Sequence, residues 1–133
     1  YNNNEDYDGI WGIWDEPFFQ YFNTTISKEK QPFMATLFSV TSHEPYQVPE
    51  KYKGRFPKGD VNIHQCIGYT DFALQQFFAS AKKQPWFKNT IFVFVGDHGN
   101  TIFYDEYKKE MNKNVVAMMI YKPNSNLNGE SII

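Results

Sequence analysis

The sequence has 133 residues, enough for one compact domain, with 13 basic and 15 acidic residues in near balance. Without an excess of Lys and Arg to neutralise phosphates, a nucleic-acid partner is excluded. Aromatic residues make up 19% of the chain, which predicts a folded protein with an aromatic core and excludes a disordered one.

The first predicted element is a helix that begins at Asp15. Aspartate caps the free N–H groups of helix N-termini, and Pro17 fits the first turn. Apolar residues then recur at helical spacing, at Phe18, Phe19, Phe22 and Ile26. Polar residues 27–31 and Pro32 end this pattern.

A buried strand is predicted over residues 33–40, a mostly apolar run between Pro32 and the Thr41-Ser42 pair. The following segment, residues 42–60, is rich in proline and glycine, and we expect an irregular loop there. Loops of this length are usually functional or disordered. The segment is therefore a candidate for a site.

The helical period returns over residues 62–83 and stops before Pro85. The apolar face predicted for this helix consists of Ile63, Ile67, Thr70, Leu74, Phe77, Phe78 and Ala81.

Two more strands are predicted in the last third of the chain. Residues 91–95 form a continuous apolar run, typical of a parallel strand covered on both faces, and residues 115–121 form another. A short helix around residues 105–110 separates them. Together with residues 33–40 these strands predict one sheet with the helix 62–83 on a face, an α/β architecture.

Asp97, His98 and Gly99 directly follow the strand 91–95, where ligands of open α/β sheets bind. Carboxylate and imidazole are both good ligands for a divalent metal, and a turn at Gly99 would let the two side chains converge. The tripeptide equally fits an ordinary turn in which Asp97 bonds its own backbone. From the motif alone both interpretations stay open.

His43 follows the strand 33–40 in the sequence Ser42-His43-Glu44-Pro45-Tyr46. A histidine at a strand end is placed to bond a substrate oxygen or to donate a proton. Taken alone, an exposed loop histidine is the better interpretation.

Three other features are interpreted as structural. His64 and Cys66 are too few ligands for a zinc site, and one cysteine excludes an intrachain disulfide. Asp71 fits a local hydrogen-bonding role within the helix. The last feature is a basic and aromatic cluster interpreted as solvated surface: Lys51, Tyr52, Lys53, Arg55 and Lys58.

Taken together, these motifs resemble a known family. They are Trp11-Gly12-Ile13 with Asp15-Glu16, Ser42 to Tyr46, Ile67-Gly68-Tyr69 with Asp71, Pro85 to Thr90, and Asp97-His98-Gly99. From about Trp11 to Lys122 the chain is similar to the C-terminal half of the sulfatase-like domain of lipoteichoic acid synthases and related phosphoglycerol transferases. These enzymes belong to the alkaline-phosphatase superfamily.

The resemblance implies a fold, a metal and site roles. The family fold is an α/β sandwich with a mixed sheet flanked by helices, of which residues 1–133 would be the C-terminal portion of one catalytic domain, an incomplete fragment. Its members bind a divalent metal, commonly manganese or zinc, with magnesium or calcium as alternatives. Asp97 and His98 match two metal ligands, and His43 matches the substrate-contacting, catalytic histidine. The nucleophile precedes the matching segment, so the chain alone is expected to be inactive.

The expected function is that of a metal-dependent phosphoglycerol transferase that acts on phospho- or sulfo-esters at the cell envelope. The alternatives are a sulfatase or phosphodiesterase of the same superfamily, and a non-catalytic module that binds an anion or a glycan. The expected partners are an anionic lipid head group or a phosphorylated or sulfated glycan, and the rest of the catalytic domain. By the resemblance the protein is placed on the outer face of the cytoplasmic membrane, in the periplasm or outside the cell. The chain contains no apolar run long enough to span a membrane and no signal peptide. A membrane-spanning segment and an export signal would therefore lie outside these residues.

Overall fold

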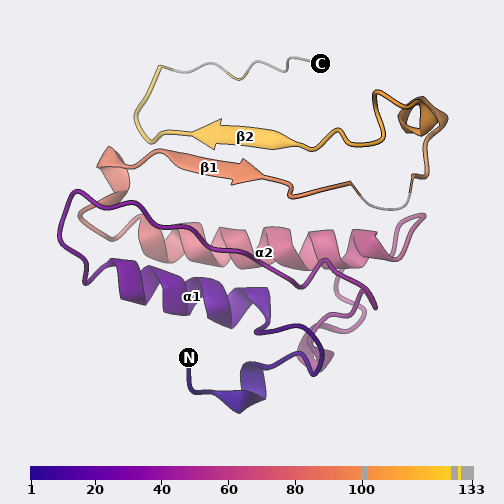
Figure 1. The fold of residues 1–133 in the computed structure, drawn as a ribbon. Coiled ribbons are helices and arrows are strands. Elements are labelled where there is room, and N and C mark those ends of the chain that lie inside the picture. The colour runs from indigo at the N-terminus through magenta and orange to yellow at the C-terminus, as the bar shows by residue number, and fades with distance from the viewer. Residues whose placement is uncertain (100–101, 127–128, 130–133) are drawn as a thin grey trace. The chain divides into compact units, whose positions relative to one another are not determined.

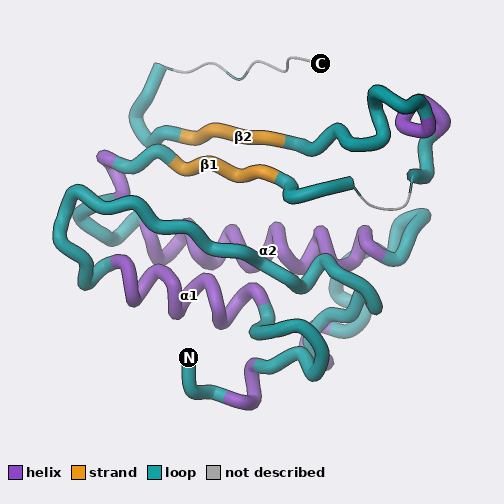
Figure 2. Tube along the Cα trace, in the orientation of Figure 1, coloured by secondary structure: helices purple, strands orange, loops and turns teal. Residues whose placement is uncertain are grey.

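The computed structural model describes residues 1–99, 102–126 and 129 (Figure 1). Its longer elements are the helices α1 (Asp15–Ile26) and α2 (Ile63–Ala81) and the strands β1 (Phe92–Val95) and β2 (Met118–Tyr121). The loops between them hold short 3-10 helices (Figure 2). The chain divides into two compact units, Tyr1–Trp86 and Phe87–Ile133.

Helices α1 and α2 lie side by side and form the core of the first unit (Figures 1 and 2). Phe77 of α2 is buried, and its ring lies 6.4 Å, centroid to centroid, from each of the rings of Phe19 and Phe22 on α1. Burying an aromatic side chain of this size contributes roughly 1.5–3 kcal/mol to folding. The aromatic content of the sequence is thus used to join the two helices.

The structure confirms both predicted helices within two residues at each end. The predicted apolar face of α2 is wrong in part, because Ile67 is 52% exposed. The buried face of α2 is shifted by about one residue from the predicted one, for example from Thr70 to Tyr69 and from Leu74 to Ala73. It consists of Cys66, Tyr69, Ala73, Phe77 and Ala81, all buried. No helix among the described residues is long and apolar enough to cross a membrane.

The predicted strand over residues 33–40 is wrong. The segment runs extended along the first unit, but none of its residues belongs to a hydrogen-bonded strand. Its apolar side chains are not buried, since Met34 is 94% and Phe38 is 65% exposed. An apolar run becomes a strand only when a second segment pairs with its backbone, and no described residue of the chain does so.

The second unit contains β1 and β2, which pair antiparallel from Phe92↔Tyr121 to Val95↔Met118 (Figure 1). The prediction that the first of these strands is parallel and covered on both faces is therefore wrong for this chain. Side chains of β1 alternate between half-buried and exposed, and those of β2 are all exposed. The described residues form a sheet of two strands, not the predicted three.

Candidate functional site

His43 lies on a tight turn in the first unit, and its side chain is exposed. The His43 N–H donates to the Val40 carbonyl at 3.0 Å, and the Tyr46 N–H donates to the His43 carbonyl, also at 3.0 Å. We call residues 41–47 the His43 loop. Its two backbone hydrogen bonds close the turn that carries the exposed imidazole.

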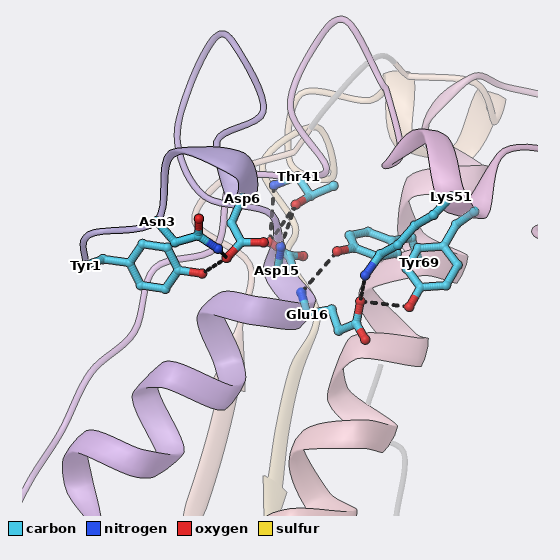
Figure 3. Close-up of polar contacts among 9 residues, drawn as sticks. Tyr1, Asn3, Asp6, Asp15, Glu16, Thr41, Lys51 and Tyr69 are labelled. Atoms are coloured by element: carbon cyan, nitrogen blue, oxygen red, sulfur yellow. Dashed lines mark hydrogen bonds and ion pairs between the residues drawn. The ribbon is translucent and has the colours of Figure 1, made fainter.

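The start of the His43 loop is fixed by a buried carboxylate. The Thr41 hydroxyl donates to Asp15 Oδ1 at 2.7 Å, and the Thr70 hydroxyl of α2 donates to Asp15 Oδ2 at 2.6 Å (Figure 3 shows the Thr41 contact). Asp15 is fully buried, and Thr41 nearly so. The predicted capping role of Asp15 is wrong: Trp14 occupies the cap position of α1. The carboxylate joins three segments of the chain instead.

The end of the His43 loop is fixed by α2. Gln65 Nε2 donates to the Tyr46 carbonyl at 2.9 Å, and the Cys66 thiol donates to the Gln47 carbonyl at 3.4 Å. Burial raises the pKa of the Cys66 thiol to about 11, and the neighbouring Asp15 carboxylate adds to the rise. The thiol is therefore protonated at neutral pH and acts as a hydrogen-bond donor.

One aromatic side chain lies directly against His43. The rings of Trp11 and His43 are 4.0 Å apart, centroid to centroid, and the Trp11 indole N–H donates to the Glu44 carbonyl at 2.8 Å. A shallow pocket beside them is lined by Trp14, Val40 and Pro45 among others. The histidine thus borders a concave surface with an aromatic wall.

A second polar network joins α1 to the long loop. The Glu16 carboxylate accepts from Lys51 Nζ at 3.0 Å and from the Tyr52 hydroxyl at 2.8 Å, and the Glu16 N–H donates to the buried Tyr69 hydroxyl at 3.1 Å (Figure 3 shows the Lys51 and Tyr69 contacts). The hydrogen bond to Glu16 raises the pKa of Lys51. Arg55 stacks on Phe72, 4.2 Å from the ring centroid. Two members of the basic and aromatic cluster are thus engaged with this carboxylate.

Asp97 and His98 lie in the second unit, two and three residues after β1. His98 Nε2 is 3.4 Å from Asp97 Oδ2, and both side chains are more than half exposed. The other ring nitrogen, His98 Nδ1, lies 2.6 Å from the Gly99 carbonyl oxygen, which is an acceptor, so this contact suits a ring with a hydrogen on Nδ1. In a ring with its hydrogen on Nδ1, the Nε2 lone pair and the Asp97 carboxylate are both available to a cation.

This geometry fits a metal ion. Two ligand atoms held by one tetrahedral ion at about 2.0–2.2 Å are themselves about 3.4 Å apart. Metal-binding histidines also donate their second N–H to a carbonyl or carboxylate, as His98 does to Gly99. Among residues 1–99, 102–126 and 129 no cluster of three or more His, Cys, Asp or Glu side chains could hold a metal. The pair therefore offers two ligands, and metal binding by it stays a prediction.

Neither of the other candidates enters a site. His64 Nδ1 accepts from the Asp60 N–H at 3.1 Å, and Asp71 accepts from Gln75 at 2.7 Å. Both are local contacts, as the sequence predicts. Because each motif follows an apolar run, we also predict that His43 lies on the same edge of the sheet as Asp97 and His98. His43 belongs to the first unit and the other two residues to the second, so this stays a prediction.

The sequence does not predict that Trp11 and Asp15 act around His43. Trp11 is identified only as part of a motif, and Asp15 only as a helix cap. The position of Trp11 does have a signal in the sequence, because Asp8 followed by Gly9 favours a turn. In that turn the Asp8 carboxylate accepts the N–H groups of Ile10, Trp11 and Gly12 at 2.7–3.0 Å. The role of Asp15 has no local signal, because its partners are distant in sequence.

Comparison with known proteins identifies the family. The family model described as "Sulfatase" matches residues 1–127. Lipoteichoic acid synthase 1 of Bacillus subtilis is 34% identical over 92 residues, which are 65% of this chain and 14% of that protein. Lipoteichoic acid synthase 2 of the same organism is 31% identical over 104 residues, 74% of this chain and 16% of that protein. The lipoteichoic acid synthase of Staphylococcus saprophyticus is 32% identical over 103 residues, with the same coverage of 74% and 16%.

A solved structure agrees. A protein of the alkaline phosphatase superfamily from Vibrio parahaemolyticus matches 93% of this chain and 31% of its own, with a TM-score of 0.72 and 25% identity. This match confirms the predicted fold class, an alkaline-phosphatase-like α/β fold of which the chain holds a part. The chain spans 14–16% of the length of these three synthases. With a family model that covers nearly its whole length, the chain belongs to the sulfatase family.

Proposed function

We propose that residues 1–133 are the C-terminal portion of one sulfatase-like catalytic domain, in a metal-dependent phosphoglycerol transferase. The observation that supports this most is the Asp97–His98 pair, whose ligand atoms are 3.4 Å apart just after β1. The chain belongs to the sulfatase family and is 31–34% identical to lipoteichoic acid synthases. This similarity favours a role of the Asp97–His98 pair in phosphoester chemistry.

Asp97 Oδ2 and His98 Nε2 would hold a manganese or zinc ion, since a mixed oxygen and nitrogen donor set suits both. A bound divalent ion supplies Lewis-acid stabilisation of the charge on the transferring group and lowers the pKa of a bound hydroxyl. Further ligands and the nucleophile would come from other parts of the full-length protein. The isolated chain would therefore bind metal weakly and show no turnover.

His43 would contact the substrate. Its ring is exposed, it borders a pocket, and its loop is fixed at both ends. A fixed imidazole suits hydrogen bonding to a phosphoryl oxygen or a leaving oxygen, because a group already held in position need not be ordered during the reaction. The substrate would be an anionic lipid head group or a phosphorylated or sulfated glycan at the outer face of the cell envelope. Membrane attachment would come from a region outside this chain.

Metal content and turnover of the full-length protein test the proposal. His98→Ala and Asp97→Asn should both lower the bound metal, measured by elemental analysis after dialysis, and should lower turnover with it. His43→Ala should lower turnover by at least about a hundredfold and leave metal content and thermal stability unchanged. Asp71→Asn on α2 is the matched control for loss of a carboxylate and should change none of these.

Two outcomes would favour the alternatives. Binding of an anionic glycan that persists in excess chelator, without turnover, would favour a non-catalytic binding module. Release of product to water alone, with no transfer to a glycerol-containing acceptor, would favour a hydrolase of the same superfamily. Wild-type metal content in both His98→Ala and Asp97→Asn would overturn the metal site itself.

A further inference from the structure

We propose that Trp11 is a positioning residue for His43, and that it acts through the Glu44 carbonyl. This inference rests on the proposed function of His43 and adds how the ring is oriented. The contacts that carry it lie within the first unit, where Trp11 and the His43 loop meet although 33 residues separate Trp11 from Glu44.

The Glu44 carbonyl is the shared acceptor. The Trp11 indole N–H donates to it at 2.8 Å, and His43 Nδ1 lies 3.2 Å from the same oxygen. A carbonyl oxygen has two lone pairs and no proton, so it accepts both contacts only if His43 Nδ1 carries a hydrogen. The arrangement thus sets the tautomer of neutral His43 with the proton on Nδ1.

The second ring nitrogen is left for a ligand. No described residue hydrogen-bonds to His43 Nε2, and the side chain is exposed. In this tautomer neutral Nε2 accepts a hydrogen bond or a proton, and the protonated ring donates from it. A substrate hydroxyl or a phosphoryl oxygen fits these two states.

The indole also restricts the rotation of the ring. The two rings are 4.0 Å apart at an interplanar angle of 44°, so Trp11 covers one side of the imidazole. Trp11 is itself held, because the Asp8 carboxylate accepts its backbone N–H at 2.8 Å. Trp11 is otherwise 54% exposed, so the His43 loop is the partner that its indole contacts in the first unit.

Two substitutions separate the hydrogen bond from the ring contact in the full-length enzyme. Trp11→Phe keeps an aromatic ring against His43 and removes the indole N–H, and it should lower kcat about threefold, the worth of one hydrogen bond. Trp11→Ala removes both and should lower kcat about tenfold, because a misoriented group loses rate. KM should change less than twofold in each. Tyr21→Ala, which removes a half-exposed aromatic ring from α1, is the control and should leave kcat unchanged.

A double-mutant cycle distinguishes positioning from a direct contact with substrate. In the His43→Ala background, Trp11→Ala should change kcat less than twofold, because its effect passes through the missing imidazole. An equal loss of kcat in both backgrounds would overturn the inference. Wild-type turnover in His43→Ala alone would instead overturn the proposed role of His43.

The tautomer supplies a readout that does not depend on turnover. With nitrogen-15-labelled histidine, the full-length protein should show the proton of neutral His43 on Nδ1, and the signal is assigned by its loss in His43→Ala. Trp11→Ala should move the tautomer toward the form protonated on Nε2, and Trp11→Phe should do so in part. An unchanged tautomer in both variants would overturn the inference even if turnover falls.

Discussion

Asp15 connects three segments of the first unit through one buried side chain. One carboxylate oxygen accepts from Thr41 and the other from Thr70, and all of these contacts are buried or half-buried. Removing such a carboxylate leaves two hydroxyl groups without their acceptor in a protein interior, and each loss costs roughly 1–3 kcal/mol. The residue is therefore expected to control both stability and the position of the His43 loop.

Asp15→Ala should lower the free energy of unfolding by about 3 kcal/mol, measured by urea unfolding of the full-length protein. Asp15→Asn should cost less, about 1 kcal/mol, because an amide keeps one acceptor oxygen and its NH₂ can donate to a hydroxyl. Asp71→Ala, which removes an exposed carboxylate that accepts a hydrogen bond from Gln75, is the control and should change stability by less than about 0.5 kcal/mol. Equal stability of Asp15→Ala and wild type would contradict the proposed anchor.

The buried thiol gives a prediction of alkaline instability. Burial raises the pKa of Cys66 from its ordinary value of 9.0 to about 11. The unfolded thiol loses its proton first, so stability is complete below about pH 9 and falls as the pH rises toward 11, by at most about 1.4 kcal/mol per pH unit. Cys66→Ala should reduce this slope in unfolding curves measured between pH 8 and 9.5, below the range in which Tyr52 and Tyr69, whose pKa values burial also raises, add to it.

Reactivity at the same residue should be low. A protonated thiol with no exposed surface reacts slowly with iodoacetamide, because the thiolate is the nucleophile. Native protein at pH 7.5 should therefore be alkylated at Cys66 only after unfolding. Rapid labelling of the native protein would show that α2 does not hold the thiol against Gln47.

At the scale of elements, the contact between α1 and α2 decides whether the first unit folds. Phe77 is the aromatic residue at its centre, 6% exposed and surrounded by rings from both helices. Phe77→Ala should lower the free energy of unfolding by about 3–5 kcal/mol, since a cavity replaces the ring. Gln76→Ala, one residue away on the exposed face of α2, is the matched control and should cost less than about 0.5 kcal/mol. A similar effect of the two substitutions in thermal unfolding would place the helix contact elsewhere.

Strand pairing shows where element predictions fail. The sequence predicts strands over residues 91–95 and 115–121, and β1 and β2 lie inside these ranges. Residues 33–40 have a similar apolar composition and form no strand. The difference is a partner: β1 hydrogen-bonds to β2 over four residue pairs. Composition shows that a segment is able to pair, but not which segment it pairs with.

At the scale of the whole molecule, apolar side chains on both strands are exposed. Met118, Met119 and Ile120 are 57–61% exposed, and Val93 and Val95 of β1 are 53% and 64% exposed. A two-stranded sheet with apolar faces is marginal in water by itself. We infer that other parts of the full-length protein cover these strands, in agreement with the 14–16% of its relatives' length that the chain spans.

A pair of lysine substitutions tests this in the full-length protein. Ile120→Lys should lower the free energy of unfolding by about 2 kcal/mol or more, because it would place an unpaired charge against covering residues. Met111→Lys, at a residue of the same unit that is 92% exposed, should cost less than about 0.5 kcal/mol. Equal thermal stability of both variants and wild type would show that β2 faces water in the intact enzyme.

The sequence by itself determined the positions of the two helices, two of the strands and the motifs at His43, Asp97 and His98. These depend on residues within a few positions of one another: apolar spacing forms a helix face, and adjacent side chains after a strand meet at a turn. The contact of His98 Nδ1 with the neighbouring Gly99 carbonyl is of the same local kind. Local chemistry of this kind can be seen in the sequence.

The tertiary structure decided what surrounds those motifs. Asp15 lies 55 residues from Thr70, and Trp11 lies 33 residues from Glu44, yet each pair is joined by a hydrogen bond. Which face of α2 is buried depends likewise on α1, and the direction of β1 depends on β2. Hydrogen bonding and burial act through space, whereas a sequence gives neighbours only along the chain. The contacts that Trp11 and Asp15 make with the His43 loop can therefore be identified only in the folded chain.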